Sequence, residues 1–278
     1  MNEQEFEERK RDIFIIEAAY DEYLKVQHQL FSYPDYAEDR NVIIATRGSK
    51  EKARSFSFSR ARQMIEFAWV MYSCGLPIEE IHSKVIYAFD DLERHLAVYP
   101  DDTFKLWEPD AYYFCMLLIS WTVLFNMPER LPLIASFISQ DEEDGLDPFI
   151  AVLFHSLGIR NFSGANAPLQ HPKPYVILYE SLREDRAGQA KAMGKYLKAW
   201  YKGKSIKNCY WHGRHEGRVP ENHLGYWAFE KGMLTVLNNL DDSSFRDMNY
   251  YPRDLIDYSR KHGWIEEFKK AVTEWKTT

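Results

Sequence analysis

Apolar residues recur at three- and four-residue intervals along most of the chain, which is the spacing of one face of an α-helix. Between Glu3 and Tyr33 this pattern predicts one long amphipathic helix. Its apolar positions are Phe6, Ile13, Ile16, Tyr20, Tyr23, Leu24, Leu30 and Phe31. Runs that alternate apolar and polar residues over the length of a strand are scarce. The sequence therefore predicts an all-α fold.

Two more helices are predicted after a polar linker that contains Gly48. The first covers Ser59 to Cys74 and stops at Gly75, because glycine readily adopts the left-handed conformation that follows many helix ends. Pro77 is predicted to lie in the first turn of the second helix. A proline is tolerated there because the backbone N–H that it lacks would have no partner within the helix. Together with the N-terminal helix, these segments predict a bundle of three antiparallel helices.

The second half of the chain is also predicted to be helical. The run AYYFCMLLISWTVLF, from Ala111 to Phe125, is shorter than the roughly 20 residues that span a bilayer and predicts a buried core helix. Further helices are predicted after Asp147, from about Glu184 to Tyr201 and from about Glu221 to Leu240. We place the boundary between an acidic N-terminal helical domain (1–126) and a C-terminal helical domain (127–278) after Asn126.

Composition adds a compartment to this picture. The chain has 278 residues, of which 45% are hydrophobic and 15% aromatic, enough for a packed core. Its three cysteines are scattered and odd in number, which favours a reducing compartment over a disulfide framework. The opening MNEQEFEERKRD is too charged for a secretory signal peptide. We therefore expect the protein to be cytoplasmic and without a membrane partner.

The net charge of −7 is concentrated in the first half. Residues 1–139 carry 15 basic and 23 acidic side chains, whereas residues 140–278 carry 20 and 19. The segment SQDEEDGLD, which ends at Asp147, adds a run of carboxylates between two apolar segments. Such a surface repels nucleic acid and attracts a cationic partner, because sequence-independent DNA binding depends on lysine and arginine.

One segment, WHGRHEGRVPENHLGYW, is the best candidate for a metal site. Its potential ligands are His212, His215, Glu216 and His223. A zinc site requires three or four ligands on defined elements, and the glycines and the proline within this segment interrupt any helix. We expect these histidines to form hydrogen bonds near a helix entrance. A metal-dependent enzyme is the less favoured alternative.

Other catalytic patterns are missing from the sequence. It contains neither of the glycine-rich phosphate-binding motifs, G-x-x-x-x-G-K-[ST] and G-x-G-x-x-G. The G-x-S-x-G turn that carries a serine nucleophile is also missing from the sequence. Glu230 has no second carboxylate at a readable spacing, so a structural hydrogen-bonding role is preferred. We predict no catalytic residue, no metal and no cofactor.

The polar stretch LDDSSFRDMNYYPRDLIDY, from Leu240 to Tyr258, looks like a site but has a structural explanation. Asp242, Ser243 and Ser244 are helix N-cap types, and Ser244 with Asp247 has the spacing of a capping box. Pro252 and Asp254 suit the first turn of a following helix, whose left-handed C-terminal cap would be Gly263. We therefore interpret the stretch as scaffold.

The same region carries a family resemblance. GYWAFEKGMLTVLNNLDDSSFRDMNYYPRDLIDYSR, from Gly225 to Arg260, resembles the C-terminal signature of the PoNi family of bacterial immunity proteins. The segments RDIFIIEAAYDEYLK and SFSRARQMIEFAWVMYSCG are similar to that family's N-terminal helical domain. The signature residues are Tyr226, Trp227, Glu230, Asp241, Asp242, Ser243, Ser244, Tyr250, Tyr251, Pro252 and Asp254.

The resemblance implies a non-enzymatic, cytoplasmic inhibitor in bacterial competition that neutralises a PoNe-type DNase toxin delivered by type VI or related secretion. The inhibitor would block the toxin's active site or its DNA-binding surface. A basic toxin would meet an acidic surface, for which the candidates are Asp141, Glu142, Glu143, Asp144 and Asp147, and secondly Asp101, Asp102 and Glu108. A homodimer is compatible with the sequence, and a general helical scaffold or adaptor protein is the alternative function.

Overall fold

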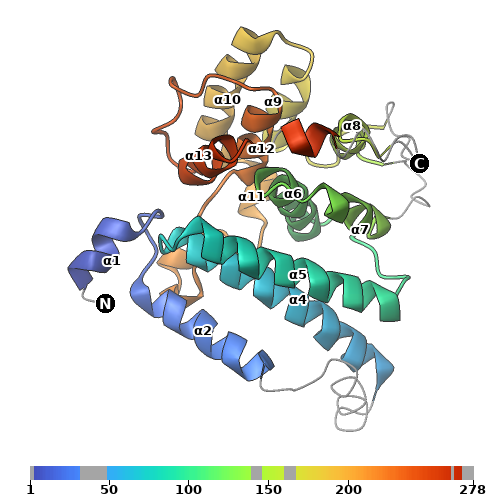
Figure 1. Cartoon of the computed structure of the whole chain (residues 1–278), viewed down its shortest axis with the longest axis vertical. Helices are drawn as coiled ribbons and strands as arrows, with labels where there is room; N and C mark the ends of the chain where they lie inside the picture. Colours follow the sequence, from blue (N-terminus) through green and yellow to red (C-terminus); the bar gives the residue numbers. More distant parts are fainter. Residues whose placement is uncertain (1–2, 32–48, 139–145, 160–166, 264–265, 271–278) are drawn as a thin grey trace. The chain divides into compact units, whose positions relative to one another are not determined.

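The computed structural model describes residues 3–31, 49–138, 146–159, 167–263 and 266–270. Within these ranges the chain forms helices joined by turns and contains no strand, so the predicted all-α fold is confirmed (Figure 1). Phe104 and Ile138 form an isolated parallel β-bridge.

The chain divides into two compact units. Unit 1 comprises residues 1–102 and 213–225, and unit 2 comprises residues 103–212 and 226–278. This division precedes the predicted boundary at residue 126, because the helix from Pro109 to Leu124 packs against a helix of unit 2 that begins at Phe229. The division into domains at residue 126 stays a prediction.

Unit 1 contains both short and long helices. They are α1 (Glu3–Arg9), α2 (Glu17–Phe31), α4 (Lys50–Ser73) and α5 (Ile78–Val98), together with the short 3-10 turns η2 (Arg214–Glu216) and η3 (Pro220–Asn222). α4 packs against both α2 and α5, and η3 packs against α2 (Figure 1). The predicted antiparallel arrangement of α4 and α5 follows from the short connection between Ser73 and Ile78.

The single N-terminal helix predicted from Glu3 to Tyr33 is wrong, because residues 10–16 interrupt it. The backbone amides of Arg11 and Asp12 donate to the carbonyl oxygen of Ser73 at 2.8 and 3.2 Å. The Asp12 carboxylate accepts from the amide of Phe14 at 2.8 Å, a local bond that competes with helical pairing. The apolar periodicity continues through this connection, yet Ile13 is 66% exposed.

The turn between α4 and α5 depends on a glycine. Gly75 has φ +79°, and a Cβ at this position would lie 2.0 Å from the carbonyl oxygen of Arg9. Any other residue would clash with this backbone atom and adopt a strained left-handed conformation. The helix end predicted at Gly75 is confirmed, and α4 begins earlier than predicted, at the Ser49 cap whose hydroxyl accepts from the amide of Lys52.

Unit 2 is built around one apolar helix. Its helices are α6 (Pro109–Leu124), η1 (Pro128–Arg130), α7 (Leu131–Ser136), α8 (Pro148–Ser156), α9 (Pro172–Ser181), α10 (Arg186–Trp200), α11 (Lys204–Lys207), α12 (Phe229–Leu237) and α13 (Arg253–Lys261). α6 is buried along almost its whole length and contacts α7, α11, α12 and α13. This confirms the predicted core helix. In the described part of the chain, every helix is too short or too polar to cross a bilayer.

The helix predicted from Glu221 to Leu240 is shorter in the structure. Residues 223–228 are not helical, Gly225 has φ +98°, and α12 starts only at Phe229. The preceding residues are held in unit 1, where the hydroxyl of Ser73 donates to the carbonyl oxygen of Leu224 at 2.6 Å. These long-range contacts replace the helical hydrogen bonds that the periodicity predicted.

Candidate functional site

Asp101 and Asp102 lie at the end of the 1–102 segment of unit 1, and their carboxylates differ in how accessible they are to a partner. Asp101 is exposed, whereas the carboxylate of Asp102 accepts from the Arg54 guanidinium and from Nε2 of the buried His95 at 2.7 Å. Nδ1 of His95 in turn lies 3.0 Å from the Ser57 hydroxyl. Partial burial raises the pKa of Asp102, but these hydrogen bonds outweigh it and hold the pKa below its usual range. Asp102 is therefore already neutralised within unit 1.

Glu108 lies at the start of unit 2. It occupies the N-cap position of α6, where its side chain is exposed and makes no capping hydrogen bond. Its neighbour Trp107 is also exposed. A free carboxylate beside a large aromatic ring offers both charge and apolar area to a partner.

Asp147 does not lie on a surface. Its side chain is 0% exposed and caps α8, accepting from the amides of Phe149 and Ile150 at 2.9 and 3.1 Å. The amide of Gln170 and the hydroxyl of Tyr112 donate to the same carboxylate at 2.8 and 3.1 Å. Four donors account for its acceptor sites, so Asp147 is a structural residue. The other members of the predicted patch, Asp141, Glu142, Glu143 and Asp144, lie outside the described residues.

Glu230 is buried at the start of α12. Its Oε1 accepts from the hydroxyl of Tyr196 at 2.5 Å and from Nε1 of Trp200 at 2.9 Å. Burial raises the pKa of Glu230 to about 7, although both hydrogen bonds act in the opposite direction. The side chain ties α12 to α10, which is the hydrogen-bonding role that the sequence favoured.

Lys231 follows Glu230 and is also buried, a feature that the sequence reasoning missed. Its Nζ lies 3.5 Å from the ring centroid of Phe245 and 4.0 Å from that of Tyr251, so the amino group faces two aromatic rings. Burial lowers the pKa of Lys231 to about 6. A lysine between apolar residues of a helix, as in FEKGML, is the sequence signal that could have identified it.

Asp242 is the centre of a polar network in unit 2. It accepts from the Tyr251 hydroxyl at 2.7 Å, from Arg260 at 3.0 Å and from Arg246 at 3.2 Å. Burial raises the pKa of Asp242, but the hydrogen bonds from Tyr251 and Arg260 outweigh it, so the pKa lies below its usual range. Arg260 also donates to the carbonyl oxygen of Leu240 at 2.7 Å, so the network ties α13 to the end of the α12 segment.

The capping role expected for Ser244 is wrong. Residues 243–247 form turns rather than the start of a helix, and the Asp241 carboxylate caps one of these turns by accepting from the amide of Ser243 at 2.9 Å. Polar residues of this type close turns as well as helices, which is why the spacing misled. Pro252 is the N-cap residue of α13 and Asp254 lies in its first turn, while Gly263 has φ +65° after the helix end.

Among the aromatic signature residues of unit 2, Tyr226, Trp227 and Tyr251 are buried and Tyr250 is half-buried. Tyr226 is buried against Tyr201, with ring centroids 4.8 Å apart. The carbonyl oxygen of Trp227 accepts from the hydroxyl of Tyr113 at 2.8 Å. Tyr250 has φ +71°, and its carbonyl oxygen accepts from the amide of Ala228 at 2.8 Å. These contacts fix the non-helical segment before α12.

The predicted histidine cluster is divided between the two units. Nε2 of His212 lies 3.1 Å from the carbonyl oxygen of Tyr201 in unit 2. His215 and His223 belong to unit 1, where Nε2 of His223 lies 3.1 Å from Oδ1 of Asp12. Among the residues whose placement is described, no three histidine, cysteine, aspartate or glutamate side chains converge on a common metal position.

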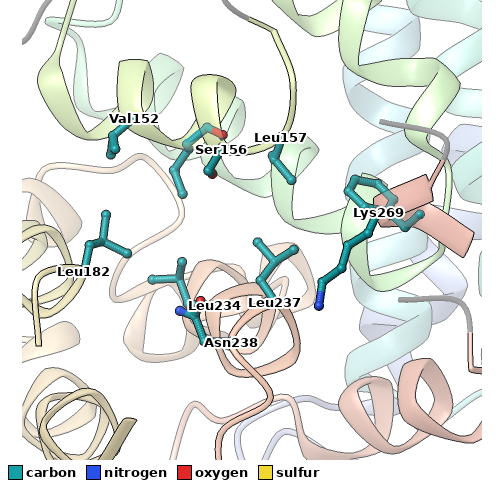
Figure 2. A pocket seen from close by; sticks show the side chains of 10 residues that line it. Val152, Ser156, Leu157, Leu182, Leu234, Leu237, Asn238 and Lys269 are labelled. Atoms are coloured by element: carbon teal, nitrogen blue, oxygen red, sulfur yellow. Dashed lines mark hydrogen bonds between the residues drawn. The ribbon is translucent and has the colours of Figure 1, made fainter. Parts of the chain in front are cut away.

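Unit 2 contains an apolar cavity of about 500 Å³ (Figure 2). It is lined by Val152, Leu153, Ser156, Leu157, Leu182, Leu234, Leu237, Asn238, Phe268 and Lys269. The residues come from α8, the end of α9, α12 and the helical residues 266–270. Most of the lining is aliphatic, so the cavity suits an apolar group better than a phosphate.

Comparisons with known families agree with the signature. The family model described as PoNe immunity protein (PoNi), N-terminal, matches residues 11–134, and the model described as PoNe immunity proteins (PoNi), C-terminal, matches residues 146–255. The two matched ranges follow one another along the chain and together include most of it. A comparison with curated proteins finds no match.

A solved structure has a similar fold. The crystal structure of protein PA2201 from Pseudomonas aeruginosa superposes with a TM-score of 0.56 at 20% sequence identity, and the alignment covers 76% of each chain. At this identity the likeness establishes the all-α fold alone.

Proposed function

Because this chain belongs to the family of PoNe immunity proteins, we propose that it binds one cognate DNase toxin and neutralises it. The observation that carries the proposal is the match of both family models along one chain. Binding would block either the active site of the toxin or the surface that receives DNA. The inhibitor itself acts without catalysis, by occupying the toxin.

Charge supports this proposal. Residues 1–139 contain 23 acidic and 15 basic side chains, and DNA-cleaving enzymes contact phosphates through lysine and arginine. Complementary charge accelerates encounter and disfavours other partners. We propose Asp101 and Glu108 as contributors, together with Asp141, Glu142, Glu143 and Asp144. Asp102 and Asp147 are left out of the contact because their carboxylates already have partners within the protein.

We also propose that the protein acts in the cytoplasm, against a toxin delivered by type VI or related secretion. The cysteines Cys74, Cys115 and Cys209 are free and buried, which suits a reducing compartment. Burial raises the pKa of the Cys74 thiol to about 12, so the unreactive thiol form dominates near neutral pH.

The test measures growth and DNA integrity in cells that express the nuclease encoded beside this gene, with and without this protein. Co-purification of the two proteins is measured in parallel. Protection with a stable complex is the expected result. A complex without protection would contradict neutralisation, and protection without a complex would contradict binding as its cause.

Charge reversal tests the acidic contact separately. Lysine at residues 141 to 144, or the variant Asp101→Lys with Glu108→Lys, should slow association with the toxin and reduce its dependence on salt. Glu180→Lys, an exposed position of α9, is the matched control. Unchanged association rates in all of these variants would refute the acidic contact while leaving neutralisation intact.

A further inference from the structure

The connection between α1 and α2 holds a group of apolar side chains in solvent. Ile13 is 66% exposed, Phe14 is 39% exposed and Ile16 is 36% exposed. Single exposed apolar residues are normal on protein surfaces, whereas neighbouring ones are uncommon. We call Ile13, Phe14 and Ile16 the 13–16 surface.

The 13–16 surface is held in place rather than loosely exposed. Directly before it, the guanidinium of Arg11 donates to the carbonyl oxygens of Tyr72 and Leu76 at 3.0 and 2.9 Å. Within it, the side chain of Ile15 is completely buried. The backbone that carries the exposed side chains is therefore anchored on both sides of Ile13, and ordering it on binding would require little conformational entropy.

The segment 213–225 supports this surface from within unit 1. The ring of His215 lies against that of Phe14, with centroids 4.1 Å apart, and the ring of the buried His223 lies 6.5 Å from it. Val219 of the same segment is exposed as well. Phe14 is thus packed against a histidine ring and still partly exposed to solvent, which is an arrangement suited to a binding hot spot.

Charge indicates which kind of protein fits here. The residues next to the 13–16 surface carry both signs of charge, because Lys10 and Arg11 precede it and Glu17 follows it in the first turn of α2. Over the described residues of unit 1, acidic side chains outnumber basic ones by 19 to 13. An apolar centre within an acidic unit is complementary to a protein that presents apolar side chains among lysines and arginines.

We propose that the 13–16 surface is part of the interface through which this protein binds its cognate nuclease toxin. The inference rests on the proposed function, because it names a surface for the same partner. The apolar residues hold the complex together, whereas the net negative charge of unit 1 steers its formation. The contact is separate from the acidic residues proposed above, which lie elsewhere in the sequence.

The experiment uses surface plasmon resonance to measure the association and dissociation rates of the full-length protein with the purified nuclease. Ile13→Ser with Ile16→Ser should weaken binding at least tenfold, mainly through faster dissociation, because buried apolar contacts determine how long a complex lasts. Ile13→Lys alone should weaken binding by at least as much, because it adds a like charge opposite a basic partner. Ile86→Ser is the matched control, since Ile86 of α5 is 38% exposed and belongs to the same unit.

Each result has a defined meaning. If the unaltered protein fails to bind the nuclease, both the proposed function and this inference are refuted. If it binds and the Ile13 and Ile16 variants bind equally well, only the inference is refuted. Thermal unfolding of each variant excludes loss of folding as the cause of weaker binding. Equal losses for Ile86→Ser would also refute the inference, because the effect would then not be specific to the 13–16 surface.

Discussion

Nε2 of His223 lies 3.1 Å from Oδ1 of Asp12, although the two residues are 211 positions apart in the sequence. Both side chains are buried in unit 1. The same Asp12 carboxylate accepts from the amide of Phe14, so one side chain fixes both the break between α1 and α2 and the returning segment 213–225. The segment is thus a structural part of unit 1.

Removal of this contact should destabilise the protein. Asp12→Ala removes an acceptor from the buried imidazole of His223 and from the amide of Phe14, and we expect a loss of about 1–3 kcal/mol in the free energy of unfolding. Urea titration followed by tryptophan fluorescence measures it. Glu216→Ala, at an exposed position of the same segment, is the control and should change stability by less than about 0.5 kcal/mol. A loss no larger than that of the control would contradict the structural role of the Asp12 to His223 contact.

The returning segment also makes a prediction about fragments. A chain of residues 1–102 lacks His223 and the carbonyl group of Leu224 that binds Ser73, so we expect it to unfold without a cooperative transition. Residues 213–225 attached through a flexible linker should restore cooperativity and dispersed amide signals in NMR spectra. The fragment 1–126, measured in parallel, tests the domain boundary predicted from the sequence. Cooperative unfolding of residues 1–102 alone would show that the segment is dispensable.

Glu230 and Lys231 should give the stability of unit 2 an unusual dependence on pH. The pKa of Glu230 is raised from 4.5 to about 7, so its favourable contribution is complete below about pH 4.5 and is lost as pH rises through 7. The pKa of Lys231 is lowered from 10.5 to about 6, so stability is lost as pH falls from 10.5 towards 6. The variant Glu230→Gln should therefore reduce the dependence of the unfolding free energy on pH in the acidic part of the range. Lys231→Met should reduce it in the basic part.

Lys231→Met should also stabilise the protein near neutral pH, by an amount on the order of a few kcal/mol, because no proton has to be removed from a methionine on folding. Unfolding titrations from about pH 5 to about pH 9 measure both effects. Lys191→Met, at an exposed position of α10, is the control and should leave the pH dependence unchanged. Parallel curves for Lys231→Met and the unaltered protein would contradict the buried position of Lys231.

The Asp242 network should contribute more to stability than exposed ion pairs nearby. Asp242→Ala removes the acceptor of Tyr251, Arg260 and Arg246, and we expect a loss of about 2 kcal/mol. Asp247→Ala, which removes an exposed pair with Arg253, should cost less than about 1 kcal/mol. Thermal unfolding distinguishes the two variants. Similar losses at both positions would show that the network adds little beyond surface charge.

The helical fold and the family signature could be predicted from the sequence. The run from Ala111 to Phe125 has apolar residues on all sides, and burial within a helical core follows from that alone. The end of α4 at Gly75 was predictable as well, because a local backbone requirement selects glycine. Such features depend on short-range spacing, which the sequence records directly.

Partners that are distant in the sequence were decided only by the tertiary structure. Asp147 belongs to an acidic run, yet four hydrogen-bond donors, among them Tyr112 and Gln170, make it a buried cap. Ile13 continues a helical stripe, yet the hydrogen bonds between residues 11–12 and Ser73 leave it exposed. Periodicity describes which side chains share a face, but burial depends on what the fold brings against that face. For this reason the sequence determined the helical fold class and the family of this protein, and the tertiary structure decided which charged and apolar side chains remain available to a partner.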